Sequence, residues 1–266
     1  MKLGLQVSSL REHLKSPQDV RETFRKIKLI GYNYVQMQYI GGKVSAESVK
    51  ESLDEAGLVC VSTQDDFNAF SRANIDKITA RNLLWRAKYV CASVNVQQDS
   101  EILDNKSKYI NALSRRFRKN GLIFEIHPLF PSLISVDDIS PLDMLLERLD
   151  DDILIQADFF HVFMSKTDGI DFIEKYGGRI IEAHFKDCKV RGNGLDMLPS
   201  RNFDVLEHFP LTPAGQGVMD WERIIEACKK RGVKYCWAEQ EEWEKDAFEC
   251  MKESFDYLVS RGLETR

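Results

Sequence analysis

Four short apolar segments in the second half of the chain each deliver a residue that can bind a metal ion. The segments cover residues 124–128, 156–161, 182–187 and 237–241, and the residues are Glu125, Asp158, His184 and Glu239. Three carboxylates and one imidazole make a mostly oxygen donor set, which suits Mn²⁺ or Mg²⁺ better than it suits a structural zinc ion. Buried at adjacent positions, these charges would repel one another unless a cation or substrate lay among them. The pattern therefore predicts a divalent metal site.

Such a site fits proton abstraction from carbon beside a carbonyl group. A cation that chelates the carbonyl and a neighbouring hydroxyl oxygen stabilises the developing ene-diolate. One carboxylate can remove the proton, and a second on the opposite face can return it and invert the centre. The residue types are thus suited to removing a proton from carbon beside a carbonyl group.

The elements that position these residues follow one recurring pattern. A helical stretch ends in glycine and a β-branched run follows at once, as at residues 30–35, 56–61, 120–125, 177–181 and 231–235. Glycine after the last helical residue adopts the left-handed conformation that other residues resist, and the chain turns back as a strand. Runs at 3–7, 88–94 and 153–157 complete a set of eight expected strands.

Eight alternating strands and helices predict a (β/α)8 TIM barrel, with a doubly wound open sheet as the alternative. No linker or composition break divides residues 1–266, so we expect a single domain. In a TIM barrel the residues at the carboxyl ends of the strands form the active site, which is where the four segments end. Residues 191–213 lack a clean period and are expected to form an inserted active-site loop.

Composition excludes several classes of protein. Across 266 residues, 37 Lys and Arg stand against 42 Asp and Glu, and the net charge of −5 argues against a nucleic-acid partner. No apolar run is long enough to span a membrane, and the first residues do not resemble a signal peptide. We therefore expect a cytoplasmic protein without a membrane partner, whose six scattered cysteines are reduced. Whether it forms a homo-oligomer stays open.

At the strand ends the sequence resembles the sugar phosphate isomerase/epimerase family of xylose-isomerase-like barrels. The resemblance rests on Glu-Ile-His at 125–127, Asp-Phe-Phe-His at 158–161, His-Phe-Lys-Asp at 184–187 and Ala-Glu-Gln-Glu at 238–241. Residues 3–11, 215–221 and 246–258 extend it over nearly the whole chain. The Gly-Gln-Gly segment at 215–217 fits a loop over the substrate, a phosphate site of backbone amides, or a turn before a helix.

The resemblance implies a role for each site residue. The metal ligands would be Glu125, Asp158, His184 and Glu239, holding Mn²⁺ first, with Mg²⁺, Co²⁺ or Zn²⁺ as alternatives. Glu125 and Glu239 would also be the catalytic acid/base pair. Substrate contacts on a small carbohydrate would come from five further residues: Gln6, Gln64, His127, His161 and Lys186. The chain departs from many members at Gln36 and Gln64, where Glu and His are common, which leaves the sugar open.

Three other functions stay open at this stage. A lyase or dehydratase acting on an inosose or a 3-keto-glycoside would use the same proton abstraction followed by elimination. A relative of the abasic-site endonucleases would need a richer histidine cluster and a basic surface, which five histidines and a net charge of −5 fit poorly. A non-catalytic sugar-binding barrel would bind metal without turnover.

Overall fold

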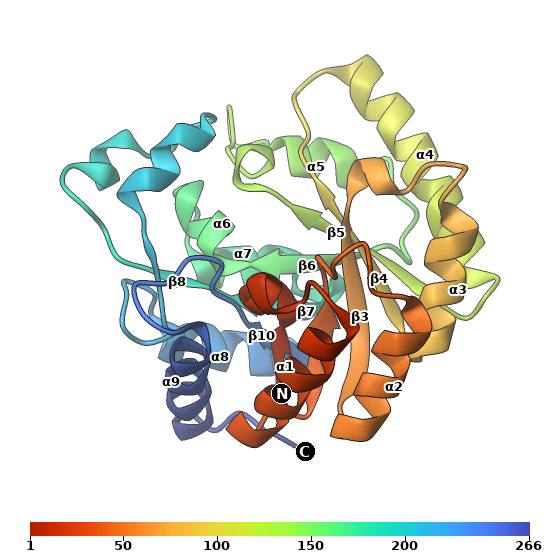
Figure 1. The fold of residues 1–266 in the computed structure, drawn as a ribbon. Coiled ribbons are helices and arrows are strands. Elements are labelled where there is room, and N and C mark those ends of the chain that lie inside the picture. Colours follow the sequence, from red (N-terminus) through yellow and green to blue (C-terminus); the bar gives the residue numbers. More distant parts are fainter.

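The computed structural model describes residues 1–266 as a closed barrel of eight parallel strands (Figure 1). The strands close in the order β1-β10-β7-β6-β5-β4-β3-β2. Their bounds are β1 Lys2–Gln6, β2 Tyr34–Met37, β3 Val59–Asp66, β4 Tyr89–Val94, β5 Ile123–Pro128, β6 Leu154–Asp158, β7 Ile180–Phe185 and β10 Tyr235–Ala238. The predicted TIM barrel is confirmed, and the open sheet is wrong, because β1 pairs with both β2 and β10.

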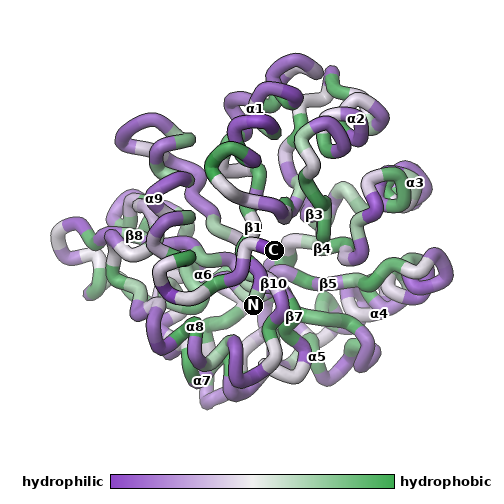
Figure 2. Tube along the Cα trace, turned by 90° about the horizontal axis from the view of Figure 1, so that it is seen from below, coloured by the Kyte–Doolittle hydropathy of each residue, from purple (hydrophilic) through white to green (hydrophobic).

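Helices surround the barrel, as the view from below shows (Figure 2). They are α1 Pro17–Ile30, α2 Ala46–Ala56, α3 Ile75–Trp85, α4 Ser100–Arg118, α5 Pro141–Leu146, α6 Phe159–Met164, α7 Gly169–Tyr176, α8 Trp221–Lys230 and α9 Ala247–Ser260. In α1, Val20, Phe24 and Ile27 are buried at helical spacing, so this face packs on the strands. None of the helices is long and apolar enough to cross a bilayer.

The glycine that follows α2 illustrates how the expected turns form. Gly57 has φ +63°, and its amide donates to the carbonyl of Asp54 while the next amide, of Leu58, donates to Leu53. A residue with a Cβ atom would be strained in this left-handed conformation. The chain therefore leaves α2 and enters β3 within two residues.

An insertion between β7 and α8 forms a layer over one side of the barrel mouth. Its two short strands, β8 Asp187–Cys188 and β9 Leu211–Thr212, pair in antiparallel fashion, and 3-10 turns at Gly194–Met197 and Phe203–His208 lie between them. Figure 1 shows this segment at the upper left, beside α6. Val205 and Phe209 of the insertion pack with Phe160 of α6 in an apolar cluster of their own. The expected loop therefore has a fixed shape.

The inside of the barrel is unusually polar toward its carboxyl end. Branched apolar side chains normally fill a TIM barrel, yet here inward-facing positions carry buried Gln6, Gln36, Ser62, Gln64, Glu125, Gln156 and Glu182. Trp237 fills the space beside Gly4, where a Cβ atom would lie 2.2 Å from the indole ring. All six cysteines are buried and unpaired. The large apolar core lies instead between strands and helices.

Candidate active site

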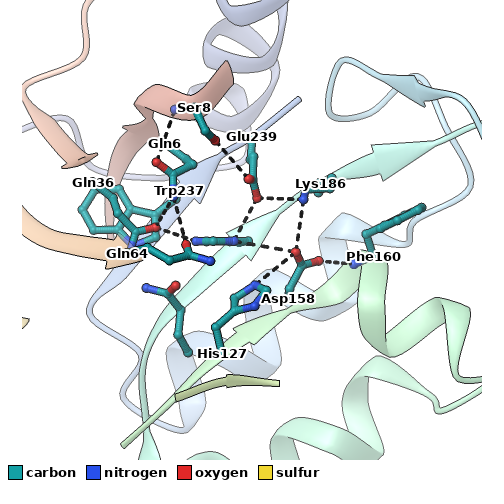
Figure 3. Close-up of polar contacts among 12 residues, drawn as sticks. Gln6, Ser8, Gln36, Gln64, His127, Asp158, Phe160, Lys186, Trp237 and Glu239 are labelled. Atoms are coloured by element: carbon teal, nitrogen blue, oxygen red, sulfur yellow. Dashed lines mark hydrogen bonds and ion pairs between the residues drawn. The ribbon is translucent and has the colours of Figure 1, made fainter. Parts of the chain in front are cut away.

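Four potential metal ligands meet where β5, β6, β7 and β10 end. Asp158 pairs in register with His184, Glu239 follows β10 directly, and His127 lies near the end of β5. Candidate ligand atoms of Asp158, His184 and Glu239 all lie within 4.8 Å of one another, and the same holds for His127, Asp158 and His161. All these side chains are buried, and Figure 3 shows most of them converging on one point.

Asp158 stands at the centre of this cluster. Its Oδ2 atom lies 3.5 Å from His127 Nε2, 3.6 Å from His184 Nδ1 and 3.8 Å from His161 Nε2. Its other oxygen, Oδ1, accepts hydrogen bonds from the first-turn amides of Phe160 and His161 and so caps α6. The helix thereby fixes the direction in which Oδ2 points.

Several ligand atoms in the cluster are buried and make no hydrogen bond of good geometry, although Glu239 Oε2 lies 2.8 Å from His184 Nδ1 and 3.1 Å from Lys186 Nζ. They are Asp158 Oδ2, Glu239 Oε2, His184 Nδ1 and both ring nitrogens of His127. Buried polar atoms are normally satisfied, so this group of convergent donors calls for a ligand. Two carboxylates and two imidazoles fit a divalent transition-metal ion.

The ring of His184 is oriented from behind by an amide network. Its Nε2 atom lies 2.6 Å from Gln36 Oε1, which also accepts a hydrogen bond from Gln6 Nε2. Gln36 Nε2 in turn donates to Ser62 Oγ, so the Gln36 oxygen is the atom that faces His184. Because that oxygen only accepts, Nε2 carries a proton, and Nδ1 is the ring nitrogen that faces Asp158 Oδ2 at 3.6 Å and Glu239 Oε2 at 2.8 Å.

The network gives Gln36 a role that the sequence analysis did not assign. Gln6 and Gln64 were expected to contact substrate; the structure places them behind His184, where Gln6 Nε2 donates to Gln64 Oε1. Their contact with substrate stays a prediction. The available signal for Gln36 was the alternation Val35-Gln36-Met37, which turns the glutamine into the barrel.

Lys186 is the cation that accompanies the carboxylates. Its Nζ atom lies 3.1 Å from Glu239 Oε2, 3.4 Å from Asp158 Oδ2 and 3.2 Å from Glu241 Oε2. Burial alone would lower the pKa of Lys186, but Glu239, Glu241 and Asp158 raise it well above its ordinary value. The ammonium therefore stays charged inside the site.

The same contacts keep both carboxylates ionised. Burial opposes the charge of Asp158 and Glu239, yet Lys186 and the neighbouring histidines together outweigh it: the pKa of Asp158 falls well below its usual range and that of Glu239 falls to about 2. For His184, burial would lower the pKa, but Glu239 and Asp158 raise it to about 9. The site is therefore a compact cluster in which carboxylates lie next to positively charged groups.

His161 differs from the other histidines in the cluster. Burial outweighs the attraction of Asp158 and lowers its pKa to about 3, so the ring is neutral. It lies on the wall of the cavity above the site. Its expected contact with substrate fits that position.

The structure does not bring Glu125 into the ligand cluster. Glu125 and His127 both point into the barrel, because they are two residues apart on β5, but only His127 lies at the level of Asp158. Glu125 lies one step deeper, beside the carboxyl group of Glu182. The structure thus brings His127, and not Glu125, together with the other candidate ligands, and the ligand role expected for Glu125 stays a prediction. The adjacent Pro128, which ends the strand, was the sequence signal for His127.

Asp187 secures the loop that precedes α8. Its Oδ2 atom accepts hydrogen bonds from the amides of Gly215 and Gly217 and from Trp221 Nε1, at 2.9, 3.2 and 2.8 Å. A Cβ atom at Gly217 would lie 2.1 Å from Asp187 Oδ1. These amides are already engaged, so they do not form a phosphate site. Asp220, whose side chain accepts from the Arg223 amide, caps α8.

A cavity of about 850 Å³ opens above the cluster toward solvent. His161 and Lys186 line it next to the ligands, and the insertion supplies much of its outer wall. Glu241, the partner of Lys186, lines it as well. The inner end of the cavity is therefore polar and contains an ionised carboxylate base and a charged lysine. Its outer end gives a small molecule access from solvent.

Several solved structures have the same fold. A sugar phosphate isomerase/epimerase from Parabacteroides distasonis is 19% identical, with a TM-score of 0.75 over 97% of each chain. The IolI protein with a bound zinc atom is 15% identical, with a TM-score of 0.74 over 98% of each chain. A probable 3-DHS dehydratase from Bacillus anthracis is 15% identical, with a TM-score of 0.71 over 97% of this chain and 99% of its own. No curated protein sequence matches the chain.

The sequence itself matches one family model over most of its length. Residues 24–259 match the model of the xylose isomerase-like TIM barrel, a range that contains every residue of the ligand cluster. Together with the closed barrel, this match agrees with the resemblance found from the strand-end motifs. The chain belongs to the xylose isomerase-like TIM barrel family.

Proposed function

We propose that the chain is a divalent-metal-dependent isomerase that converts an unphosphorylated sugar by moving a proton between adjacent carbons. The observation that carries this proposal is the convergence of His127, Asp158, His184 and Glu239 at the barrel mouth, with buried ligand atoms that make no hydrogen bond of good geometry. The relatives with this fold include a sugar phosphate isomerase/epimerase.

The donor set favours one group of metals. His127 replaces the expected Glu125, so two imidazoles accompany the carboxylates of Asp158 and Glu239, and Zn²⁺, Mn²⁺ or Co²⁺ suit this mixture better than Mg²⁺. The preference for Mn²⁺ among these stays a prediction. When bound, such an ion supplies polarisation of the substrate carbonyl.

The chain's own residues then perform the proton transfers. Glu239, ionised at neutral pH, accepts the proton from the carbon beside the carbonyl and returns it to the neighbouring carbon on the same face. Lys186 donates a hydrogen bond to the substrate oxygen on which negative charge develops. The neutral ring of His161 can pass the hydroxyl proton from one oxygen to the other.

One carboxylate base favours isomerisation over the epimerisation that the sequence analysis also considered. Inversion of a centre needs proton-transfer groups on both faces of the substrate. Glu125 was expected to be the second group, but it lies deeper in the barrel, beside Glu182. A single glutamate can serve a transfer that begins and ends on one face.

A lyase is the second candidate, and one contact favours it. Lys186 Nζ lies 3.1 Å from Glu239 Oε2, so a base and an ammonium acid stand side by side. Glu239 would take the carbon-bound proton while Lys186 gave a proton to a departing hydroxyl group, which leaves as water. The probable dehydratase among the relatives has the same fold.

Proton exchange with solvent tests both candidates. The zinc- or manganese-loaded protein is incubated in D₂O with unphosphorylated aldoses, ketoses and inososes and with their phosphate esters, and NMR follows the carbon-bound hydrogens. Isomerisation gives deuterium at the carbon beside the carbonyl together with a new aldose or ketose, whereas a lyase gives an unsaturated product. If no compound exchanges although one metal ion is bound per chain, both proposals are wrong.

The charged side chains that line the cavity also indicate which kind of molecule can bind there. Asp204, Glu207, Glu241 and Glu242 line the cavity together with Arg11, Lys186 and Arg191. This mixed set suits a neutral carbohydrate better than a nucleic acid, whose phosphates need clustered cations.

A further inference from the structure

The outer part of the cavity contains aromatic side chains that the proposed chemistry does not use. Tyr39, Phe160 and Phe203 line it, from the β2–α2 loop, α6 and the insertion. At about 850 Å³ the cavity is near the upper end of the range for pockets that hold drug-sized ligands. A single sugar ring at the metal ligands would leave the aromatic part empty.

Tyr39 is held at the cavity in a costly conformation. Its φ of +54° lies in the left-handed region, which costs a residue with a Cβ atom about 1 kcal/mol. The ring is nonetheless 48% exposed, and its hydroxyl donates to Asp66 Oδ1 over 3.4 Å. Strain that leaves an aromatic ring facing an open cavity is typical of a binding position.

Phe203 presents a second aromatic surface that is fixed in advance. It is 41% exposed, yet its ring centroid lies 4.7 Å from that of the fully buried Phe130. Phe160 continues the surface inward, since Lys186 Nζ lies 6.0 Å from its ring centroid (Figure 3). Tyr39, Phe160 and Phe203, which we call the aromatic wall, all line the cavity, and Phe160 is the one that lies next to Lys186.

The charges beside the wall disfavour an anionic group. Lys186 and Arg191 are engaged by Glu241 and Glu244, and the guanidinium of Arg11 lies 5.7 Å from the Trp243 ring. Asp204 and Glu242 line the same space without a basic partner. A phosphate or carboxylate would meet these acids, whereas an uncharged ring would bury its face on the aromatic wall.

Building on the proposed function, we propose that the substrate is a sugar with two rings. The ring with the free anomeric carbon, which supplies the carbonyl group, lies at the metal ligands, and a second, uncharged ring attached to another of its hydroxyl oxygens packs on the aromatic wall. The first ring is recognised by the polar inner end of the cavity, and the second ring by Tyr39 and Phe203.

Binding of matched sugar derivatives to the metal-loaded protein tests this without requiring turnover. Isothermal titration compares glucose, galactose and xylose that carry a methyl, phenyl or β-glucosyl group on the 4-hydroxyl oxygen and keep a free anomeric carbon, so that each set differs only in the second group. We expect the phenyl or the glucosyl compound of at least one sugar to bind about tenfold more tightly than its methyl partner. Which of the two gains more distinguishes an aromatic from a sugar ring.

Substitutions test which residues cause the tighter binding of the two-ring compounds. Phe203→Ala and Tyr39→Ala should each reduce the ratio of affinities at least threefold while leaving the affinity for the methyl derivative unchanged. Leu195→Ala is the matched control, because Leu195 is 51% exposed in the same insertion but does not line the cavity. Equal affinity of all partners, no binding of any two-ring compound, or a ratio that Phe203→Ala leaves intact would overturn the proposal. Failure of the D₂O exchange test leaves this binding result unaffected, so the two proposals fail separately.

Discussion

Two pairs of buried carboxyl groups lie one above the other inside the barrel, and they behave in opposite ways. In the upper pair, Asp158 and Glu239, the pKa of each group lies below its ordinary value. In the lower pair, burial raises the pKa of Glu125 well above its usual range and that of Glu182 to about 7. Both pairs are buried, so burial is not what separates them.

The two pairs differ in the charged and neutral groups that surround them. The upper carboxylates have Lys186 within 3.4 Å, whereas the lower pair has only neutral donors, such as Gln156 Nε2 and Trp237 Nε1 on Glu182. A carboxylate surrounded by a low dielectric stays ionised only when a cation compensates it. The upper pair can therefore hold a metal ion and act as a base, while the lower pair retains a proton.

Glu239→Gln should give the largest effect, because it removes the base from the upper pair. An amide cannot accept the substrate proton, so turnover should fall by roughly 10²–10⁴. Circular dichroism should show an intact fold. Turnover within a few-fold of the original protein, with metal bound, would assign the base to another residue.

Asp158→Asn should weaken metal binding by roughly 100-fold, since the substitution removes the central ligand charge. The asparagine oxygen can still cap α6, so the helix keeps its start. Titration with Zn²⁺ or Mn²⁺ measures the affinity, and Glu125→Gln is the matched control from the lower pair. Equal loss in both variants would mean that the two pairs form one metal site.

Lys186→Met should strengthen metal binding by about tenfold while it lowers turnover. The ammonium contacts Asp158 and Glu239 in the place where a cation is expected, so its charge opposes the metal. The same titration measures this gain. Weaker binding in Lys186→Met would show that the lysine organises the ligands instead of competing with the ion.

Glu125→Gln should change stability and not chemistry. When folding raises the pKa of a carboxyl group, the protein's free energy of unfolding falls as the pH rises above the unfolded pKa near 4.5. For Glu182 this fall continues to about pH 7. The substitution removes the part of this fall that the Glu125 carboxyl group causes. The glutamine side chain can still donate a hydrogen bond to Glu182. We expect a higher free energy of unfolding than that of the original protein at pH 8 and little change at pH 5.

Urea unfolding at both pH values checks that expectation, with the exposed Glu226→Gln as control. A variant that unfolds more easily at pH 8 than the original protein would mean that Glu125 carries a compensated charge.

The sequence by itself determined the barrel and the level at which the site lies. Turns such as that at Gly57 and the spacing of the strand runs were enough, because they depend on local backbone preference and on short-range periodicity. Asp158, His184 and Glu239 were found because each lies at the end of its strand, where local boundaries can be read from the apolar runs.

Only the tertiary structure decided between Glu125 and His127 and gave Gln36 and Lys186 their places. A strand turns residues 125 and 127 to the same face, so the choice depends on how β5 is staggered against β6 and β7, which closure of the barrel sets. The opposite protonation of the two carboxyl pairs could not be predicted from the sequence for the same reason. It depends on whether a lysine from a neighbouring strand reaches the carboxylates, and no local pattern encodes a contact between residues that are distant in the chain.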